Sequence, residues 1–284
     1  MHKLITELER LYFLPDQQWH SLKLDAAGAA PGSAEGLLTP AIVARNLAGE
    51  ANVALDLVGT DGAVRAMVVD FERAADWERV AELYQAVQDE LELPAPALSV
   101  SGHRGYRLWF SLAEAVDAAQ ARDFLAALQR KYLSDMPAVQ VGLAPAALTP
   151  GLHLVTGKWS AFIDPTMGAM FVDEPGLEMA PNMERQADLL ARLKSIGTTD
   201  FQRGLEFLQP PAADLKSPVG GPVGAVSRPA EEGGPSSEKL NLGNQYADPQ
   251  SFLLAVMNDP AASTDQRIAA AKALLPYFVS NKGP

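Results

Sequence analysis

The most constraining feature of this sequence is residues 64–73, a short apolar run that ends in two carboxylates, Asp70 and Glu72, separated by one residue. In a β-strand, side chains two positions apart point to the same face of the sheet. The spacing therefore predicts that Asp70 and Glu72 project side by side while Phe71 points into the core. Two carboxylates this close repel each other unless a cation lies between them. Oxygen-ligand pairs of this kind suit Mg²⁺ or Mn²⁺.

A second stretch, residues 99–110, adds a basic turn between two apolar strands. It contains Gly102 and Gly105 together with His103, Arg104 and Arg107. Glycines let a backbone approach a phosphate closely, and arginine binds phosphate oxygens in a bidentate manner. Taken alone, the acid pair also fits a helix cap, and the turn fits a soluble hairpin loop. Together they indicate a divalent ion at one group and the triphosphate that it accompanies at the other.

Composition limits the classes of function. With 284 residues, 48% of them hydrophobic, the chain can form one large domain or two smaller ones with a sizeable core. It has no cysteine, which excludes disulfides, thiolate metal sites and a cysteine nucleophile. The net charge of -12 opposes nucleic-acid binding over the whole surface, so a DNA contact needs a local basic patch. No signal core or bilayer-length apolar run is found, so we expect a cytoplasmic protein without a membrane partner.

Periodicity and turn residues predict an α+β fold, with helices flanking a mainly antiparallel sheet. The Ala/Gly/Ser/Pro-rich residues 25–36 indicate a loop. The turn at residues 59–62 predicts that residues 53–58 and 64–71 form a hairpin. The order of strand pairs and helices predicts that the helices lie on one side of the sheet. The helices are expected over residues 4–14, 39–49, 75–91, from a capping box at 111–114 to about 132, and 182–196, and the further strands over residues 98–100, 106–111, 152–155, 159–163 and 171–172.

The chain is expected to contain three parts. Residues 1–208 form the α+β domain. Residues 209–240, rich in Pro, Gly, Ser and Ala, predict a flexible, disordered linker. Residues 241–284 predict a short helical tail, which is too small to hold a core of its own. We therefore expect the tail to dock on a partner or to pair with another copy.

The two stretches resemble the archaeo-eukaryotic primase superfamily, the primase-polymerases. Its members carry an apolar strand ending in acid-x-acid, then a strand of the form Ser-Gly-x-x-Gly-x-His-x-Trp, and later an acid after another apolar strand. Residues 68–72 match the first motif, and residues 101–110 match the second, except that Arg107 stands where the family usually has His. Asp164, which follows Phe162 and Ile163, is the best candidate for the third. The resemblance covers about residues 4–193.

This resemblance implies a DNA primase/polymerase-like nucleotidyltransferase of a phage, prophage or plasmid, with an RRM-like catalytic core. Two Mg²⁺ or Mn²⁺ ions would link Asp70, Glu72 and Asp164 to the nucleotide phosphates and activate a 3′-hydroxyl. Its partners would be nucleoside triphosphates and a single-stranded or primed DNA template. The nucleotide-binding residues that the resemblance implies are Ser101, His103, Arg104, Arg107 and Lys158.

Two departures from the family pattern support an alternative. Arg107 can hold a phosphate, but it cannot exchange a proton near neutral pH as His can. Glu72, in the second acid position, moves a ligand oxygen by about one methylene relative to Asp. The alternative is a non-catalytic adaptor with a primase fold that binds DNA or a protein in phage or plasmid replication or packaging. Residues 252–277 resemble a helical segment of phage terminase small-subunit-like proteins, which implies a replication or packaging partner for the tail.

A third interpretation is an unrelated α+β protein in which Asp70 and Glu72 only cap a helix. Metal affinity separates the first two interpretations, because an adaptor has no need of a competent acid cluster.

Overall fold

The computed structural model describes residues 1–25, 28–136 and 139–209. The helices are α1 His2–Tyr12, α2 Pro40–Leu47, α3 Trp77–Asp89, α4 Ala118–Tyr132, α5 Met183–Ala191 and α6 Thr198–Leu208, with 3₁₀ segments at Ala74–Asp76 and Pro165–Phe171. The strands are β1 Gln18–Asp25, β2 Gly28–Leu37, β3 Val53–Leu55, β4 Ala63–Phe71, β5 Ala97–Val100, β6 Tyr106–Asp117, β7 Val139–Gly142, β8 Ala146–Ala147, β9 Gly151–Leu152 and β10 Trp159–Phe162.

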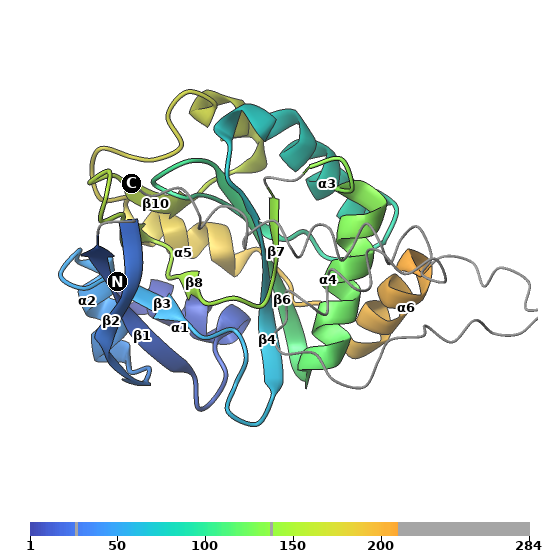
Figure 1. Cartoon of the computed structure of the whole chain (residues 1–284), viewed down its shortest axis with the longest axis horizontal. Helices are drawn as coiled ribbons and strands as arrows, with labels where there is room; N and C mark the ends of the chain where they lie inside the picture. The colour runs from blue at the N-terminus through green and yellow to red at the C-terminus, as the bar shows by residue number, and fades with distance from the viewer. Residues whose placement is uncertain (26–27, 137–138, 210–284) are drawn as a thin grey trace, which may run out of the picture. The chain divides into compact units, whose positions relative to one another are not determined.

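The strands form two sheets (Figure 1). The smaller sheet has the order β2–β1–β3–β8, and the larger has the order β7–β4–β6–β5–β10–β9. Neighbouring strands within both sheets run antiparallel. The predicted α+β class with a mainly antiparallel sheet is therefore confirmed.

Helices cover both faces of the larger sheet, so the prediction that they lie on one side is wrong. Strand β4 shows the reason, because its buried residues alternate between two apolar clusters. Met67 and Val69 pack on the cluster that contains α3, α4 and α6. Ala66 and Val68 pack on the cluster that contains α1, α2, α5 and part of the smaller sheet. The two groups of elements lie on opposite sides of β4 and β6 in Figure 1.

The predicted hairpin of residues 53–71 is also wrong. Strand β3 pairs with β1 and β8, whereas β4 pairs with β6 and β7. A turn does form, since the amide of Gly62 donates to the carbonyl of Gly59 at 2.9 Å. This turn carries the chain from the smaller sheet to the larger one. Of the Ala/Gly-rich segment predicted as a loop, residues 28–36 instead lie in strand β2, which pairs with β1 on both sides of one irregularity.

The start of α4 lies later than the capping-box pattern predicts. Strand β6 continues to Asp117, whose carboxylate accepts a hydrogen bond from the amide of Ala119 at 2.7 Å and caps the helix. The hydroxyl of Ser111 instead donates to the carbonyl of Leu11 at 2.6 Å. The expected strand at residues 171–172 is wrong as well, because Phe171 ends a 3₁₀ segment.

The remaining expectations differ in outcome. The helix expected over residues 4–14 is confirmed but begins and ends two residues earlier, and those over 39–49, 75–91 and 182–196 are confirmed with shorter bounds. Helix α6 was not predicted, and of residues 152–155 only the first lies in a strand. From residue 210 onward, the predicted linker and tail lie outside the described residues. None of the helices in the described ranges combines the length and the apolar character that a membrane crossing requires.

Candidate functional site

The register of the larger sheet brings the acid-ended strand and the basic turn together. Asp70 on β4 lies opposite Arg107 on β6, Arg107 lies opposite Ser99 on β5, and Ser99 lies opposite Phe162 on β10. Directly opposed residues share one face of a sheet. This face is the one that packs towards α1, α5 and the smaller sheet, because Phe162 belongs to that cluster.

A cleft of about 410 Å³ lies at this end of β4 and β6, with residues of both sheets in its walls. We call it the acid-pair cleft. Its volume is within the range of small-molecule sites. Its lining is rich in polar side chains, namely His20, Asn46, Asn52, Asp70, Glu72, Ser101, Arg107, Gln140, His153 and Ser160.

The cleft contains an ion pair between Asp70 and Arg107. The Nε of Arg107 donates to Oδ2 of Asp70 at 2.6 Å, and the two side chains are 27% (Asp70) and 15% (Arg107) exposed. The Nη1 atom of Arg107 is buried and has no hydrogen-bond partner among the described residues. Glu72, the second acid, accepts a hydrogen bond from the side-chain amide of Gln140 on β7. Both acids therefore already have a protein partner.

Ser101 organises the basic turn. Its buried Oγ accepts hydrogen bonds from the backbone amides of His103, Arg104 and Gly105 at 3.2, 3.1 and 3.1 Å. Its hydroxyl thus fixes the path of the turn that leads into β6.

The glycines of the turn are required by packing against backbone. A Cβ on Gly105 would lie 1.9 Å from the carbonyl oxygen of Phe71. Gly102 has a φ of +73°, and a Cβ there would lie 2.9 Å from the amide nitrogen of Ser160. These contacts hold the turn against the ends of β4 and β10, which is a structural reason for glycine at both positions.

Two stacked imidazoles, His103 and His153, lie beside the ion pair. Their ring centroids are 4.4 Å apart and the ring planes differ by 10°. Burial lowers the pKa of His153 to about 4, with further lowering by His103, Arg107 and Arg104. Burial and then the two arginines also lower the pKa of His103. Both rings are therefore neutral at pH 7.

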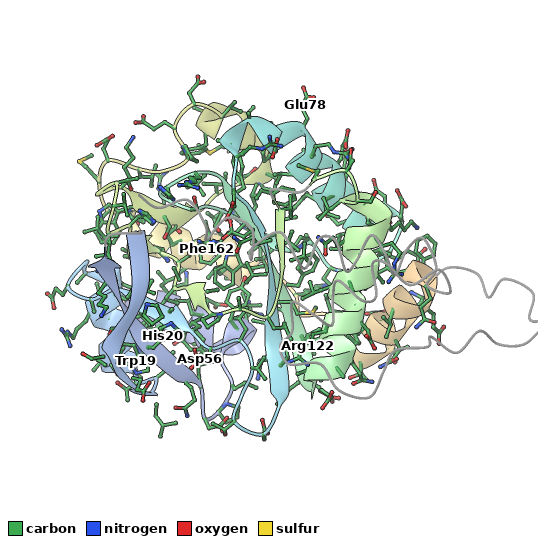
Figure 2. All side chains as sticks on the ribbon, viewed as in Figure 1. Trp19, His20, Asp56, Glu78, Arg122 and Phe162 are labelled. Carbon is green, nitrogen blue, oxygen red and sulfur yellow. The ribbon has the colours of Figure 1, made fainter. Side chains whose placement is uncertain are left out.

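The smaller sheet contributes a second histidine group to the cleft (Figure 2). The Nδ1 of His20 on β1 lies 2.9 Å from Oδ1 of Asp56. No local signal in the sequence marks His20 or His153, since both reach the cleft only through long-range strand pairing. Of the cleft residues, Asp70, Glu72, Ser101 and Arg107 were identified from the two motifs.

Asp164 and Lys158 are not brought to the acid pair. Asp164 caps the 3₁₀ segment, accepting hydrogen bonds from the amide and hydroxyl of Thr166 at 3.0 and 2.6 Å. Phe162 is level with Asp70 in the sheet, so Asp164 lies two residues beyond that row, and it lines a different pocket. The ammonium of Lys158 pairs with two glutamates, Glu174 and Glu178.

The remaining predicted residue is Arg104, whose side chain is exposed on the basic turn. The structure thus groups Asp70, Glu72, Ser101 and Arg107 in one cleft, and His103 stacks on His153, which also lines it. Within residues 1–25, 28–136 and 139–209, no cluster of three His, Cys, Asp or Glu side chains could hold a metal ion. Two carboxylates nevertheless suffice for an ion that completes its coordination with substrate phosphates and water.

One family model matches part of the chain. Residues 26–143 match the model of the archaeo-eukaryotic primase domain of TOTE conflict systems. No curated protein matches the chain significantly.

Two solved structures are similar to the chain at low sequence identity. The archaeo-eukaryotic primase domain of the cyanophage S-2L primase-polymerase is 13% identical, with a TM-score of 0.37 over 66% of this chain and 97% of that one. The polymerase domain of Mycobacterium tuberculosis ligase D, in complex with DNA, is 16% identical, with a TM-score of 0.43 over 67% and 86%.

Proposed function

We propose that the chain is a primase-polymerase-like nucleotidyltransferase, because residues 26–143 match the model of an archaeo-eukaryotic primase domain. Its substrate would be a nucleoside triphosphate bound in the acid-pair cleft. The observation that carries this proposal is that Asp70, Glu72 and Arg107 line one cleft of a suitable volume. The acids provide oxygen ligands for a metal ion, and the arginine provides hydrogen bonds to phosphate oxygens. Nucleotidyl transfer from a triphosphate uses both kinds of group.

Arg107 would be the main contact to the phosphates. Its side chain is held by Asp70 on the neighbouring strand β4, and its Nη1 has no partner among the described residues. Arg104, exposed on the same turn, adds a second positive charge. Because the whole chain has a net charge of -12, a polyanion needs this local positive charge in order to bind.

The acid pair would hold Mg²⁺ or Mn²⁺ together with the phosphates. Asp70 and Glu72 supply hard carboxylate oxygens, and such ions are often bound by one or two carboxylates plus substrate phosphates. When bound, the ion would neutralise phosphate charge and favour attack by a 3′-hydroxyl. The Ser101 turn would hold Arg104 and Arg107 in register with the acids, and the neutral His103–His153 stack would exclude water from one wall.

A primed or single-stranded DNA template is the proposed second substrate. The test is incorporation of labelled nucleotides on primed and unprimed templates with Mg²⁺ or Mn²⁺. We expect the wild type to incorporate nucleotide and Asp70→Asn to lose about 100-fold or more, as for loss of a group that stabilises transition-state charge. Asp135→Asn, which changes an exposed acid paired with Arg79, is the matched control and should be unaffected.

The second candidate is a nucleotide-binding or DNA-binding adaptor without catalysis. Two observations favour it: Asp70 is already paired with Arg107, and Asp164 lies in a different pocket. Such an adaptor would bind a triphosphate or DNA yet incorporate no nucleotide with either ion. The proposed replication or packaging partner of the tail would then be its main target.

A further inference from the structure

We propose that Arg107 is an internal counterion that keeps Asp70 from binding a metal ion until a nucleotide is present. In the free protein its guanidinium is paired with Asp70. When a triphosphate binds, the guanidinium turns to the phosphates and releases Asp70 to the divalent ion. The inference rests on the proposed nucleotide site and adds an order of binding to it: the ion binds with or after the nucleotide, and weakly alone.

In the free protein, the carboxylate of Asp70 is already bound by the guanidinium of Arg107. Asp70 and Arg107 are direct cross-strand partners on adjacent strands, so the backbone holds the two side chains in register. The 2.6 Å bond between Nε and Oδ2 is a short, charge-assisted hydrogen bond. Both side chains are mostly buried, so solvent screens this attraction less than it screens a surface pair. A divalent ion must compete with this contact for the same carboxylate.

The Nη1 end of Arg107 favours exchange of the Asp70 carboxylate for a phosphate group of the nucleotide. Its Nη1 is buried without a partner among the described residues, which is an unfavourable state for a charged donor. The carboxylate of Asp70 uses only Nε. A phosphate group presents several anionic oxygens to the guanidinium fork and can pair with two of its nitrogens at once. The exchange of Asp70 for phosphate therefore satisfies a donor that the ion pair leaves unsatisfied.

Glu72 does not replace Asp70 as a free ligand. Its carboxylate accepts a hydrogen bond from Gln140, which is itself the β7 partner of Asp70 in the sheet. With Asp70 neutralised by Arg107, the acid pair carries a net charge near that of one carboxylate. A divalent ion alone is consequently attracted weakly, and removal of the guanidinium should strengthen its binding.

The test measures binding of Mn²⁺ alone to the full chain, without nucleotide, by electron paramagnetic resonance of the free ion. We expect Arg107→Gln to bind Mn²⁺ about 5- to 150-fold more tightly than the wild type, the usual range of coupling between two sites. Adding Asp70→Asn to Arg107→Gln should return the affinity to the wild-type level. Arg79→Gln removes an arginine that pairs with Glu82 and Asp135 on the surface, and it should change nothing.

Arg107→His is the second variant, in case Arg107→Gln does not fold, and the same gain in Mn²⁺ affinity is expected. The inference is overturned if either folded variant binds Mn²⁺ no more tightly than the wild type, or if the gain persists after Asp70→Asn.

These outcomes are separable from those of the proposed function. A wild type that incorporates nucleotide while the variants gain no Mn²⁺ affinity overturns the counterion role alone. A gain that depends on Asp70, in a protein that incorporates nothing, supports the counterion role and overturns the polymerase activity.

Discussion

Asp70 and Arg107 are direct partners across β4 and β6, joined by a 2.6 Å hydrogen bond between the guanidinium Nε and the carboxylate Oδ2. The first carboxylate of the acid pair therefore has a cation supplied by the protein itself. In the superfamily pattern that the sequence resembles, this position of the second motif usually holds a histidine. The arginine in this chain adds a positive charge to the cleft and pairs with the carboxylate of Asp70.

Arg107→Gln should also lower stability. It leaves the carboxylate of Asp70, 27% exposed, without its counterion. We expect a loss of about 1–2 kcal/mol in the free energy of unfolding, between the values for surface and buried pairs. Urea denaturation measures this. Arg79→Gln, in an exposed pair, should cost less than about 1 kcal/mol, and equal losses in the two variants would contradict the account.

Gly105→Ala should be among the most destabilising small substitutions in the chain. The new methyl group would lie 1.9 Å from the Phe71 carbonyl oxygen, a backbone atom that cannot move without disturbing the end of β4. We expect a loss of about 1–3 kcal/mol, as for overpacking, measured by thermal or urea unfolding. Gly142→Ala is the matched control in β7, where an added Cβ meets nothing within 4 Å. A Gly105→Ala protein as stable as Gly142→Ala would show that the turn does not pack as described.

His153 should make the protein acid-sensitive. Its pKa falls from 6.5 to about 4, first because it is buried and then because of His103 and the two arginines. The unfolded chain therefore binds more protons than the folded chain between these values, so stability is lost as the pH decreases from 6.5 to 4.

The full shift corresponds to about 3 kcal/mol, which solvent screening reduces to about 1–2 kcal/mol. Urea midpoints measured from pH 7.5 to pH 4 test this, with His153→Gln as the comparison. The variant should lose less stability over this range than the wild type. Parallel pH profiles of the two proteins would refute the assignment.

Asp164→Ala should affect folding more than the acid-pair cleft. The side chain caps the 3₁₀ segment through Thr166, and these hydrogen bonds hold the pKa of Asp164 below its usual value. Loss of a cap costs about 0.5–2 kcal/mol. Because Asp164 lines a different pocket, Mn²⁺ binding in the presence of a triphosphate should remain at the wild-type level. A loss of that binding would restore Asp164 as the third metal ligand.

The strand, the acid pair and the turn that form the site were predictable because the sequence patterns that predict them are local. The apolar run of β4, the alternation of Asp70, Phe71 and Glu72, and the glycine turn before β6 all follow from spacing within a few residues. The prediction that Phe71 is buried is confirmed. The pairing of β4 with β6 was not predicted, because α3 and β5 separate the two strands in the sequence.

The errors arose where distant segments decide local structure. The turn containing Gly59 and Gly62 has the composition of a hairpin, yet β3 finds its partners in β1 and β8, and these pairings have no local signature. The segment after Ser111 satisfies a capping-box pattern, but the amide of Ala113 bonds to the carbonyl of Ile196, which extends the strand. His20 reaches the cleft for the same kind of reason, through the pairing of β1 with β3.

The most direct test of the central claim is the position of Mn²⁺ in crystals grown with a non-hydrolysable nucleoside triphosphate, located by anomalous scattering. The account predicts a peak at the carboxylates of Asp70 and Glu72, with the triphosphate on the guanidinium of Arg107 and the Asp70–Arg107 bond broken. A peak at Asp164, or a triphosphate bound outside the acid-pair cleft, would contradict it.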